Sequence, residues 1–326
     1  MAEAAYGTAV GDPDLIRAGL FKGPDMGERI PEIITDEEQI GRGHDFPDSQ
    51  VIHTWSSQMT RTWDASVFWV GWAFAFAMGT AAVAGAVDPW THTLKFMDEN
   101  VDGTQLPSAT IIEEIVGVSS LLNRKYTGMC VNEVTLTASG KGRVQLTCSL
   151  VGNGQVAVNA LAIPAITPAD EYLRGSNVDM TVNAVNLKDY IKGWSLKISN
   201  NLMLDDGYVL GTAGDFGKFR ERMFFGRRSV ELALTILAPP TATLDFQALM
   251  EAGTNAPVVI TCSTEDVNHD VTLNIDNYKF TATPKGSDNN QLIFNVAGNA
   301  FWTAADQGPL EVITNDAVDL AHLAAA

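Results

Sequence analysis

Cysteine and positive charge are both scarce in this sequence of 326 residues. Its three cysteines cannot form a disulfide framework, and none has the close cysteine neighbour that a zinc site uses. Lys and Arg number 21 against 39 Asp and Glu, which gives a formal net charge of −18. A surface this acidic repels phosphate, so the composition argues against a dedicated nucleic-acid binder and against a protein held on membranes by a polybasic surface.

Targeting and catalytic motifs are also missing. The first fifteen residues have neither the basic nor the apolar region of a secretory signal, so we expect a cytoplasmic origin. No G-x-x-x-x-G-K-[ST] phosphate loop, H-E-x-x-H zinc helix or G-x-S-x-G elbow occurs, and the five histidines are scattered. We therefore expect no enzymatic activity, no catalytic residue, no metal site and no cofactor.

What is present is a globular composition, with 46% hydrophobic and 18% charged residues, in a chain long enough for one large or two ordinary domains. Residues 1–64 form a separate zone. Its first fifty residues hold 11 of the 39 acids but only 4 Lys or Arg, and they show no sustained period of 2 or 3.6. We predict an acidic N-terminal arm, extended or looped, that orders against a partner.

One uncharged stretch, residues 65–87, is long enough to form a membrane helix. It is rich in Ala and Gly, however, and large side chains alternate with alanines, the large ones including Trp72, Phe74 and Phe76. A period of two is typical of a strand. We therefore predict a buried strand or a subunit interface in this stretch, and no membrane span.

From about residue 90 the patterns are mainly those of strands. Residues 131–138 and 143–151 alternate, and the short glycine-rich segment between them predicts a hairpin. With Gly140 and Lys141 as the turn pair, Cys130 would face Val151 and Cys148 would face Glu133. Both cysteines would then be unpaired core residues.

Further elements follow from the same patterns. A helix is expected at 244–252, capped by Thr243 and ended by Gly253. Additional strands are expected at 156–163, 194–199, 230–237, 258–263, 271–282 and 291–298.

The sequence also contains an internal repeat. Residues 134–153 resemble residues 278–299, with Gly152-Asn153 matching Gly298-Asn299 and Thr137-Ala138 matching Thr281-Ala282, and residues 93–96 resemble 195–198. We predict two copies of one β unit, at 65–175 and 176–305, followed by a C-terminal tail at 306–326.

A basic and aromatic cluster stands out against the acidic background. Four phenylalanines are interleaved with five cations, namely Lys218, Arg220, Arg222, Arg227 and Arg228. Arg and aromatic residues are enriched in subunit interfaces, which favours an intersubunit contact at this cluster. For the same reason, further candidates for intersubunit contacts are Trp72, Phe74 and Phe76. A solvated loop and a surface that stacks single-stranded nucleic acid stay open as alternatives.

The strand patterns carry a family resemblance. The segments T-H-T-L (91–94), Y-T-G-M-C-V-N-E-V-T-L-T (126–137) and V-Q-L-T-C-S-L-V-G-N (144–153) resemble the tail tube proteins, or major tail proteins, of long-tailed bacteriophages. W-S-L-K-I-S-N-N (194–201), R-S-V-E-L-A-L-T-I (228–236) and Q-L-I-F-N-V-A-G (291–298) extend the resemblance to the long form, in which two tube units are fused.

This resemblance implies a mainly β fold, made of duplicated tube-type β-sandwich or barrel units with long hairpins and a flanking helix. It implies a structural virion protein whose copies form rings, three chains per ring with pseudo-sixfold symmetry. The rings would stack into a tail tube through which DNA passes to the host. The implied partners are the tape measure, terminator and baseplate proteins, with assembly in the bacterial cytoplasm and only transient contact with DNA.

The excess acid has two interpretations in such a tube. Acids on polar strand faces, with Glu133, Glu231 and Asp276 as candidates, would line the channel and repel passing DNA, or they would only keep the outer surface soluble. A capsid decoration or spike protein and a carbohydrate-binding β-sandwich are the alternative functions.

Overall fold

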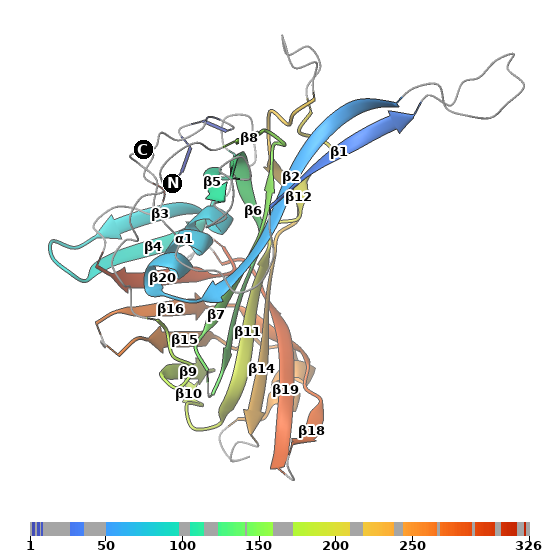
Figure 1. The fold of residues 1–326 in the computed structure, drawn as a ribbon. Helices are drawn as coiled ribbons and strands as arrows, with labels where there is room; N and C mark the ends of the chain where they lie inside the picture. The colour runs from blue at the N-terminus through green and yellow to red at the C-terminus, as the bar shows by residue number, and fades with distance from the viewer. Residues whose placement is uncertain are drawn as a thin grey trace, which may run out of the picture.

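The structure is a computed structural model. It describes residues 2–3, 5–6, 8, 27–35, 50–97, 105–113, 123–140, 142–158, 172–208, 218–237, 244–265, 268–288, 291–303, 308–317 and 323. These residues form a mainly β fold with two large antiparallel sheets and two short helices, as predicted (Figure 1).

The larger sheet, called the main sheet below, is a path of eight strands. In spatial order they are β1 (Glu28–Thr35), β2 (Gln50–Asp64), β7 (Gln145–Gly152), β6 (Arg124–Ser139), β11 (Ile191–Ser199), β14 (Ser229–Leu237), β19 (Gln291–Ala300) and β17 (Tyr278–Ala282). Three short strands extend it: β18 (Lys285–Asp288) pairs with β19, while β5 (Ala109–Glu113) and β8 (Val156–Val158) pair with β6.

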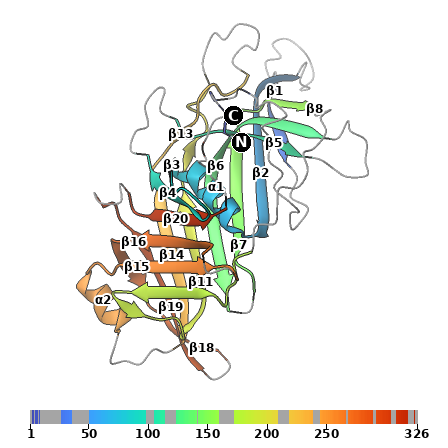
Figure 2. The ribbon, with the colours of Figure 1, turned by 90° about the vertical axis from the view of Figure 1, so that its left-hand side faces the viewer.

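The second sheet, called the small sheet, has seven strands. Their order is β10 (Val185–Asn186), β9 (Val178–Val182), β15 (Val258–Ser263), β16 (Asp270–Ile275), β20 (Glu311–Asp316), β4 (Trp90–Phe96) and β3 (Gly79–Ala84). A separate pair is formed by β12 (Leu202–Met203) and β13 (Phe224–Phe225). The small sheet packs against one face of the main sheet, and the strands of the two sheets cross steeply (Figures 1 and 2).

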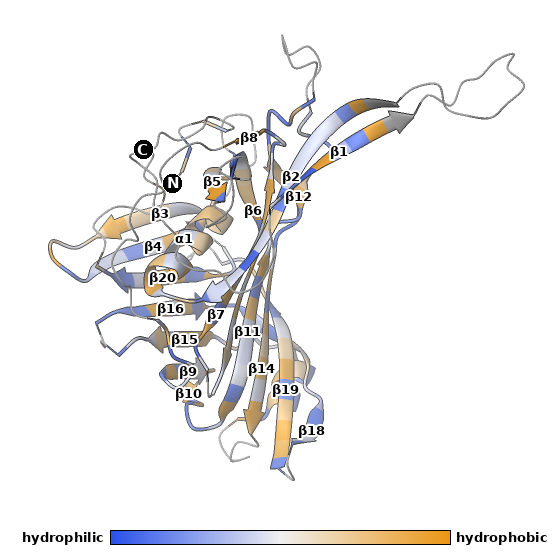
Figure 3. Ribbon diagram, viewed as in Figure 1, coloured by the Kyte–Doolittle hydropathy of each residue, from blue (hydrophilic) through white to orange (hydrophobic). Residues whose placement is uncertain are grey.

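The core lies between the sheets and follows from the period of two. Leu136, Leu146 and Leu196 point inward from the main sheet, while Leu94 and Leu273 point inward from the small one, and all are buried. Intervening residues point to the other face of the main sheet, so hydrophobic and hydrophilic residues are mixed along its long strands (Figure 3).

The first part of the uncharged stretch forms a helix, so the prediction of a strand is wrong for the alternating residues there, and the strand in this stretch is β3, which follows the helix. Helix α1 (Val67–Met78) begins at Ser66, whose hydroxyl accepts from the Trp69 amide, and ends at Gly79 with φ 101°. It packs between the sheets, contacting β6 on one side and β4, β16 and β20 on the other. Because α1 is covered on both sides, it lacks the polar face that gives a 3.6-residue pattern. Within the described residues, no helix is both long and apolar enough to cross a membrane.

The second helix and most strands lie where they were predicted. Helix α2 (Phe246–Ala252) ends at Gly253 in the left-handed conformation, as expected, but its N-cap is Asp245, and Thr243 lies outside the described residues. The expected strand at 271–282 is divided into β16 and β17, and of the strand expected at 156–163 only β8 falls within the described part.

The β6–β7 hairpin has the predicted pairing at one end only. Cys130 faces Val151 as expected, whereas Cys148 faces Val134 because a β-bulge after Val131 shifts the register by one residue. Both cysteines are buried and unpaired, as predicted.

The N-terminal zone contains two strands that its composition did not indicate. β1 and β2 form a long hairpin whose far end projects from the body of the molecule (Figure 1). The near end of β2 pairs with β7, and its inward residues there are Ser57, Met59, Arg61 and Trp63. Two of these four are polar, so the usual alternation is absent, and the expectation that this zone lacks regular structure is wrong for β1 and β2.

The two halves of the chain repeat one order of elements. Each has two paired strands, a helix and a later hairpin, and the main sheet consists of two quartets, β1-β2-β7-β6 and β11-β14-β19-β17. The smaller resemblances do not follow this order. Of the segments that resemble each other in sequence, residues 93–96 lie in the small sheet and residues 195–198 in the main sheet. Thr137-Ala138 adjoins the turn of its hairpin, whereas β18 lies between Thr281-Ala282 and the corresponding turn.

Candidate assembly surfaces

The face of the main sheet that the small sheet leaves uncovered is rich in hydroxyl and amide groups. One row of cross-strand neighbours runs through Thr62, Thr147, Thr135, Lys197, Glu231, Asn299 and Lys279. The next row runs through Thr60, Ser149, Glu133, Ser199 and Ser229. All of these side chains are exposed or half-buried, so the rows form a continuous polar surface, called the uncovered face below.

Charges on these two rows are balanced. Glu133 and Lys197 form an ion pair at 2.7 Å, and Lys197 on β11 also lies opposite Glu231 on β14. Lys279 supplies a second cation, so two acids stand beside two lysines. Most of the chain's excess acid is carried by residues outside the described ranges.

The three candidate channel acids differ in position. Glu133 and Glu231 lie on the uncovered face, as their strand positions predict. Asp276 is exposed in the connection between β16 and β17, so its expected place on a polar strand face is wrong.

Two arginines of the basic cluster make contacts within the chain. Arg220 is 6% exposed and donates from Nε to the Leu204 carbonyl at 2.7 Å and from Nη1 to the Gly152 carbonyl at 2.9 Å. These bonds fasten the segment before β14 to the end of β7. Arg228 stacks on Phe225 at 3.4 Å and donates to a carbonyl at the end of α1.

The other cations differ in exposure: Lys218 and Arg222 are half-buried, and Arg227 is exposed. Of the five, Arg227 is the one most accessible to another molecule. An intersubunit role for the cluster stays a prediction, and for Arg220 and Arg228 the structure shows intrachain contacts instead.

The aromatic candidates on α1 belong to the core. Phe74 and Phe76 are fully buried between the two sheets, so a contact between subunits is the wrong assignment for them. Trp72 is half-buried and packs on Phe76, with ring centroids 4.6 Å apart. The sequence shows that these residues are apolar, but it cannot distinguish burial inside a chain from burial between chains.

The two ends of the main sheet are surfaces that the sequence did not indicate. Among the described residues, β1 pairs only with β2, and β17 and β18 pair only with β19. Glu28 and Glu32 are exposed on β1, and Lys285 is exposed on β18. Ile30 and Ile33 are also exposed on β1. An edge strand with unpaired backbone groups is a template for pairing with another chain.

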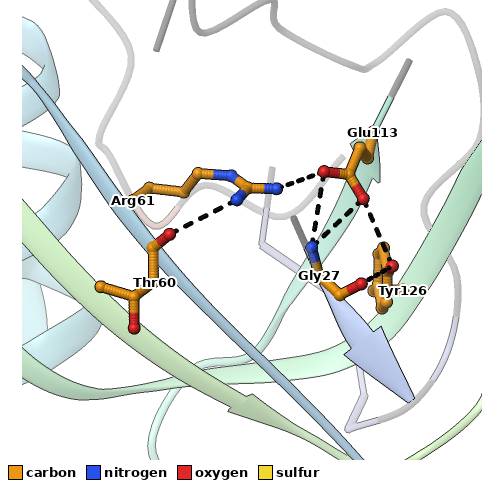
Figure 4. A network of polar contacts seen from close by, with 5 residues as sticks. All are labelled: Gly27, Thr60, Arg61, Glu113 and Tyr126. Atoms are coloured by element: carbon orange, nitrogen blue, oxygen red, sulfur yellow. Dashed lines mark hydrogen bonds and ion pairs between the residues drawn. The ribbon is translucent and has the colours of Figure 1, made fainter. Parts of the chain in front are cut away.

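A buried polar network holds the start of β1 in place (Figure 4). Arg61 donates to the Glu113 carboxylate at 2.5 Å, and the same carboxylate accepts from the Gly27 amide at 3.3 Å. The Tyr126 hydroxyl donates to the Gly27 carbonyl at 2.8 Å. Removal of Tyr126 from water, aided by the nearby Glu113 charge, raises the pKa of Tyr126 to about 12. The edge at β1 is therefore anchored by groups from β2, β5 and β6.

These features define a class of protein: a mainly β structure of two crossed sheets, with a repeated strand order, an uncovered hydroxyl-rich face and two open sheet edges. The family model for the phage tail tube protein matches residues 2–300. The chain therefore belongs to the phage tail tube protein family, as its sequence predicts, and is a structural protein of the virion tail. Comparison with curated proteins finds no match.

Proposed function

We propose that copies of this chain close into a ring by joining the β17–β18 edge of one copy to the β1 edge of the next. The observation that carries this proposal is the junction inside the chain. There, β6 of the first quartet pairs antiparallel with β11 of the second, from Glu133–Ser199 to Ser139–Gly193. The same kind of junction between chains would extend the sheet without leaving an open edge. Three copies would give six quartets and a pseudo-sixfold ring.

Charge supports this pairing of edges. The β1 edge presents Glu28 and Glu32, and the opposite edge presents Lys285, with Lys279 half-buried beside it. Each edge also carries one charge of the other sign that is engaged within the chain. Arg29 on β1 donates to the Gly154 carbonyl, and Asp288 on β18 forms an ion pair with Lys192. Opposite signs on the two edges favour head-to-tail association, whereas two β1 edges repel each other. Such a head-to-tail contact closes into a ring when its rotation permits.

In this ring the uncovered face lines the channel. Its hydroxyl and amide groups interact with water, and its balanced charges neither bind phosphate strongly nor exclude it, so DNA passes without adhering. Glu133 and Glu231 would face the DNA. The work of the protein is geometric, with no catalytic step and no cofactor. The rings assemble in the host cytoplasm and contact the tape measure, terminator and baseplate proteins at particular points of the tail.

The duplication suggests different unit boundaries from those at 65–175 and 176–305. The first repeated unit would begin at β1 and the second at β11, since each of these strands opens a quartet of the main sheet. β20, which lies beyond the family match, then completes the small sheet between β16 and β4.

Charge reversal across the two edges tests the ring. Glu28→Lys and Lys285→Glu should each abolish ring formation, because each places like charges on the facing edges. The doubly reversed chain should recover it. Glu251→Lys, a reversal at an exposed site on α2, is the matched control and should assemble normally. Light scattering would report the ring as three times the 35.0 kDa chain mass, and negative-stain microscopy would show its shape. Single reversals that assemble as well as the control would refute the edge pairing.

A further inference from the structure

Strand β3, which among the described residues pairs only with β4, and the turn after it form an unusual surface. No charged residue occurs from Gly79 to Val87, and every residue from Ala82 to Val87 is exposed, with Val83 at 37% and Val87 at 74%. Edge strands are normally protected by lysine, proline or a bulge. Within Gly79–Ala84, β3 has none of these, and its pairing with β4 is regular throughout. An exposed, uncharged edge of this kind indicates a surface that another chain covers.

The opposite edge of the small sheet is β10, next to β9. Asn186 on β10 is exposed, and so is Ala184 in the turn before it. Of the charged residues near this edge, Lys188 and Asp179 form an ion pair at 3.0 Å, and Asp189 is also exposed. Because β3 itself carries no charge, it has no like charge that would repel the β10 edge.

The two edges point in opposite directions along the molecule. The long strands of the main sheet run from top to bottom in Figures 1 and 2, and the small-sheet strands run across them. The small sheet consequently has β3 at its upper end and β10 at its lower end in Figure 1. If the main sheet lines a channel, its strands run broadly along the channel axis, and β3 and β10 face the two neighbouring rings.

We propose that rings stack by placing the β3 edge of one copy against the β10 edge of a copy in the next ring. The partner is a second copy of this chain. The contact is heterologous, so a ring of three copies has three β3 edges on one side and three β10 edges on the other, and a growing stack keeps one set exposed at each end, as an open filament requires. This inference rests on the proposed ring, since it is the ring that orients the small sheet along the axis.

A disulfide across the contact tests the identity of the partner. In the Ala82→Cys, Asn186→Cys chain, mild oxidation of assembled tubes should link chains into a ladder longer than a dimer. Either single substitution should give no ladder. The three native cysteines are buried and do not compete. A matched control pairs Ala82→Cys with Thr235→Cys, which lies on the uncovered face, and should give no ladder either.

A charge on the edge tests the effect on assembly. Ala82→Lys should leave single rings and abolish their stacking, because an exposed edge lysine must lose its hydration when another edge covers it. Tubes of the double-cysteine chain without a ladder, or normal tubes of Ala82→Lys, would overturn the stacking contact while leaving the ring intact. Failure of the wild-type chain to form rings would instead refute the proposed function.

Discussion

Replacement of Glu113 by alanine should detach the start of β1 from the rest of the main sheet. Glu113 is the carboxylate partner of Arg61, and their side chains are 14% and 8% exposed. Removing one member of a buried pair costs about 3–5 kcal/mol, because the remaining charge stays desolvated. We expect a loss of about 3 kcal/mol, at the low end of that range, since Glu113 retains some contact with water.

The measurement combines urea unfolding of the unassembled chain with hydrogen exchange of the β1 amides. Glu113→Ala should lower the urea midpoint and speed exchange in β1 more than in β14, which lies far from the network in the main sheet. Lys188→Ala is the matched control. It breaks an ion pair whose side chains are 55% and 53% exposed, so its cost should stay below about 1 kcal/mol.

A double substitution separates the ion pair from the packing around it. Arg61→Met combined with Glu113→Leu removes both charges and should cost less than Glu113→Ala alone, because no desolvated charge remains. Equal costs for Glu113→Ala and Lys188→Ala would refute the assignment of Glu113 as an anchor. A double variant less stable than the single one would show that the pair itself, and not the unpaired charge, carries the stability.

Four further outcomes follow from individual side chains. Phe74→Ala should lower the free energy of unfolding of the unassembled chain by about 3–5 kcal/mol, as measured by urea unfolding. A variant with normal stability that fails to assemble would show that Phe74 lies in a subunit interface after all. Arg220→Met should destabilise the chain by about 2 kcal/mol, because the buried Gly152 carbonyl and the part-buried Leu204 carbonyl lose a charged donor, whereas Arg227→Ala should change its stability by less than about 0.5 kcal/mol. Tyr126→Phe should be less stable than wild type at neutral pH. The two urea midpoints should converge as the pH rises from about 10 to about 12, since folding favours the neutral hydroxyl and that contribution is lost through this window. Glu231→Lys should slow DNA release from particles that carry it, measured by ejection assays, because it adds cations to the uncovered face. Unchanged release would show that the uncovered face does not line the channel.

The parts of the fold that could be predicted from sequence are those in which one face is buried and the other is wet. This property is shared by β6, β7, β11 and β14. In these strands the alternation predicted the strand itself and also which of its residues point into the core. α1 lacks it, because both sheets cover the helix and leave no polar side to mark its period. β2 was missed for the opposite reason, since its inward positions include the polar Ser57 and Arg61, which contact Met129 and Glu113.

The assembly surfaces were harder to predict because they depend on which strands end a sheet. The local pattern of β3 does not differ from that of an interior strand, and strand order is set by contacts between residues far apart in the chain. Pro31 in β1 is typical of an edge strand, but the sequence did not predict that β1 is a strand. Arg220 shows the same limit. Its neighbours in sequence suggest an exposed basic cluster, but its hydrogen-bond acceptors include Gly152, which lies 68 positions away.

Duplication changes what the open edges must do. In a ring of three fused chains, every second junction is of the β6–β11 kind and is formed when the chain folds, so only the β1 and β17–β18 edges must find partners in another copy. Those edges must remain soluble until they meet, although unpaired strand edges promote aggregation. Charged residues on both edges meet this need. Glu28 and Glu32 on one side and Lys285 on the other disfavour pairing of like edges and favour the head-to-tail contact. β3 has no such protection. Within the assembly proposed here it is covered only after the ring exists, which places stacking after ring closure and explains why its surface is uncharged.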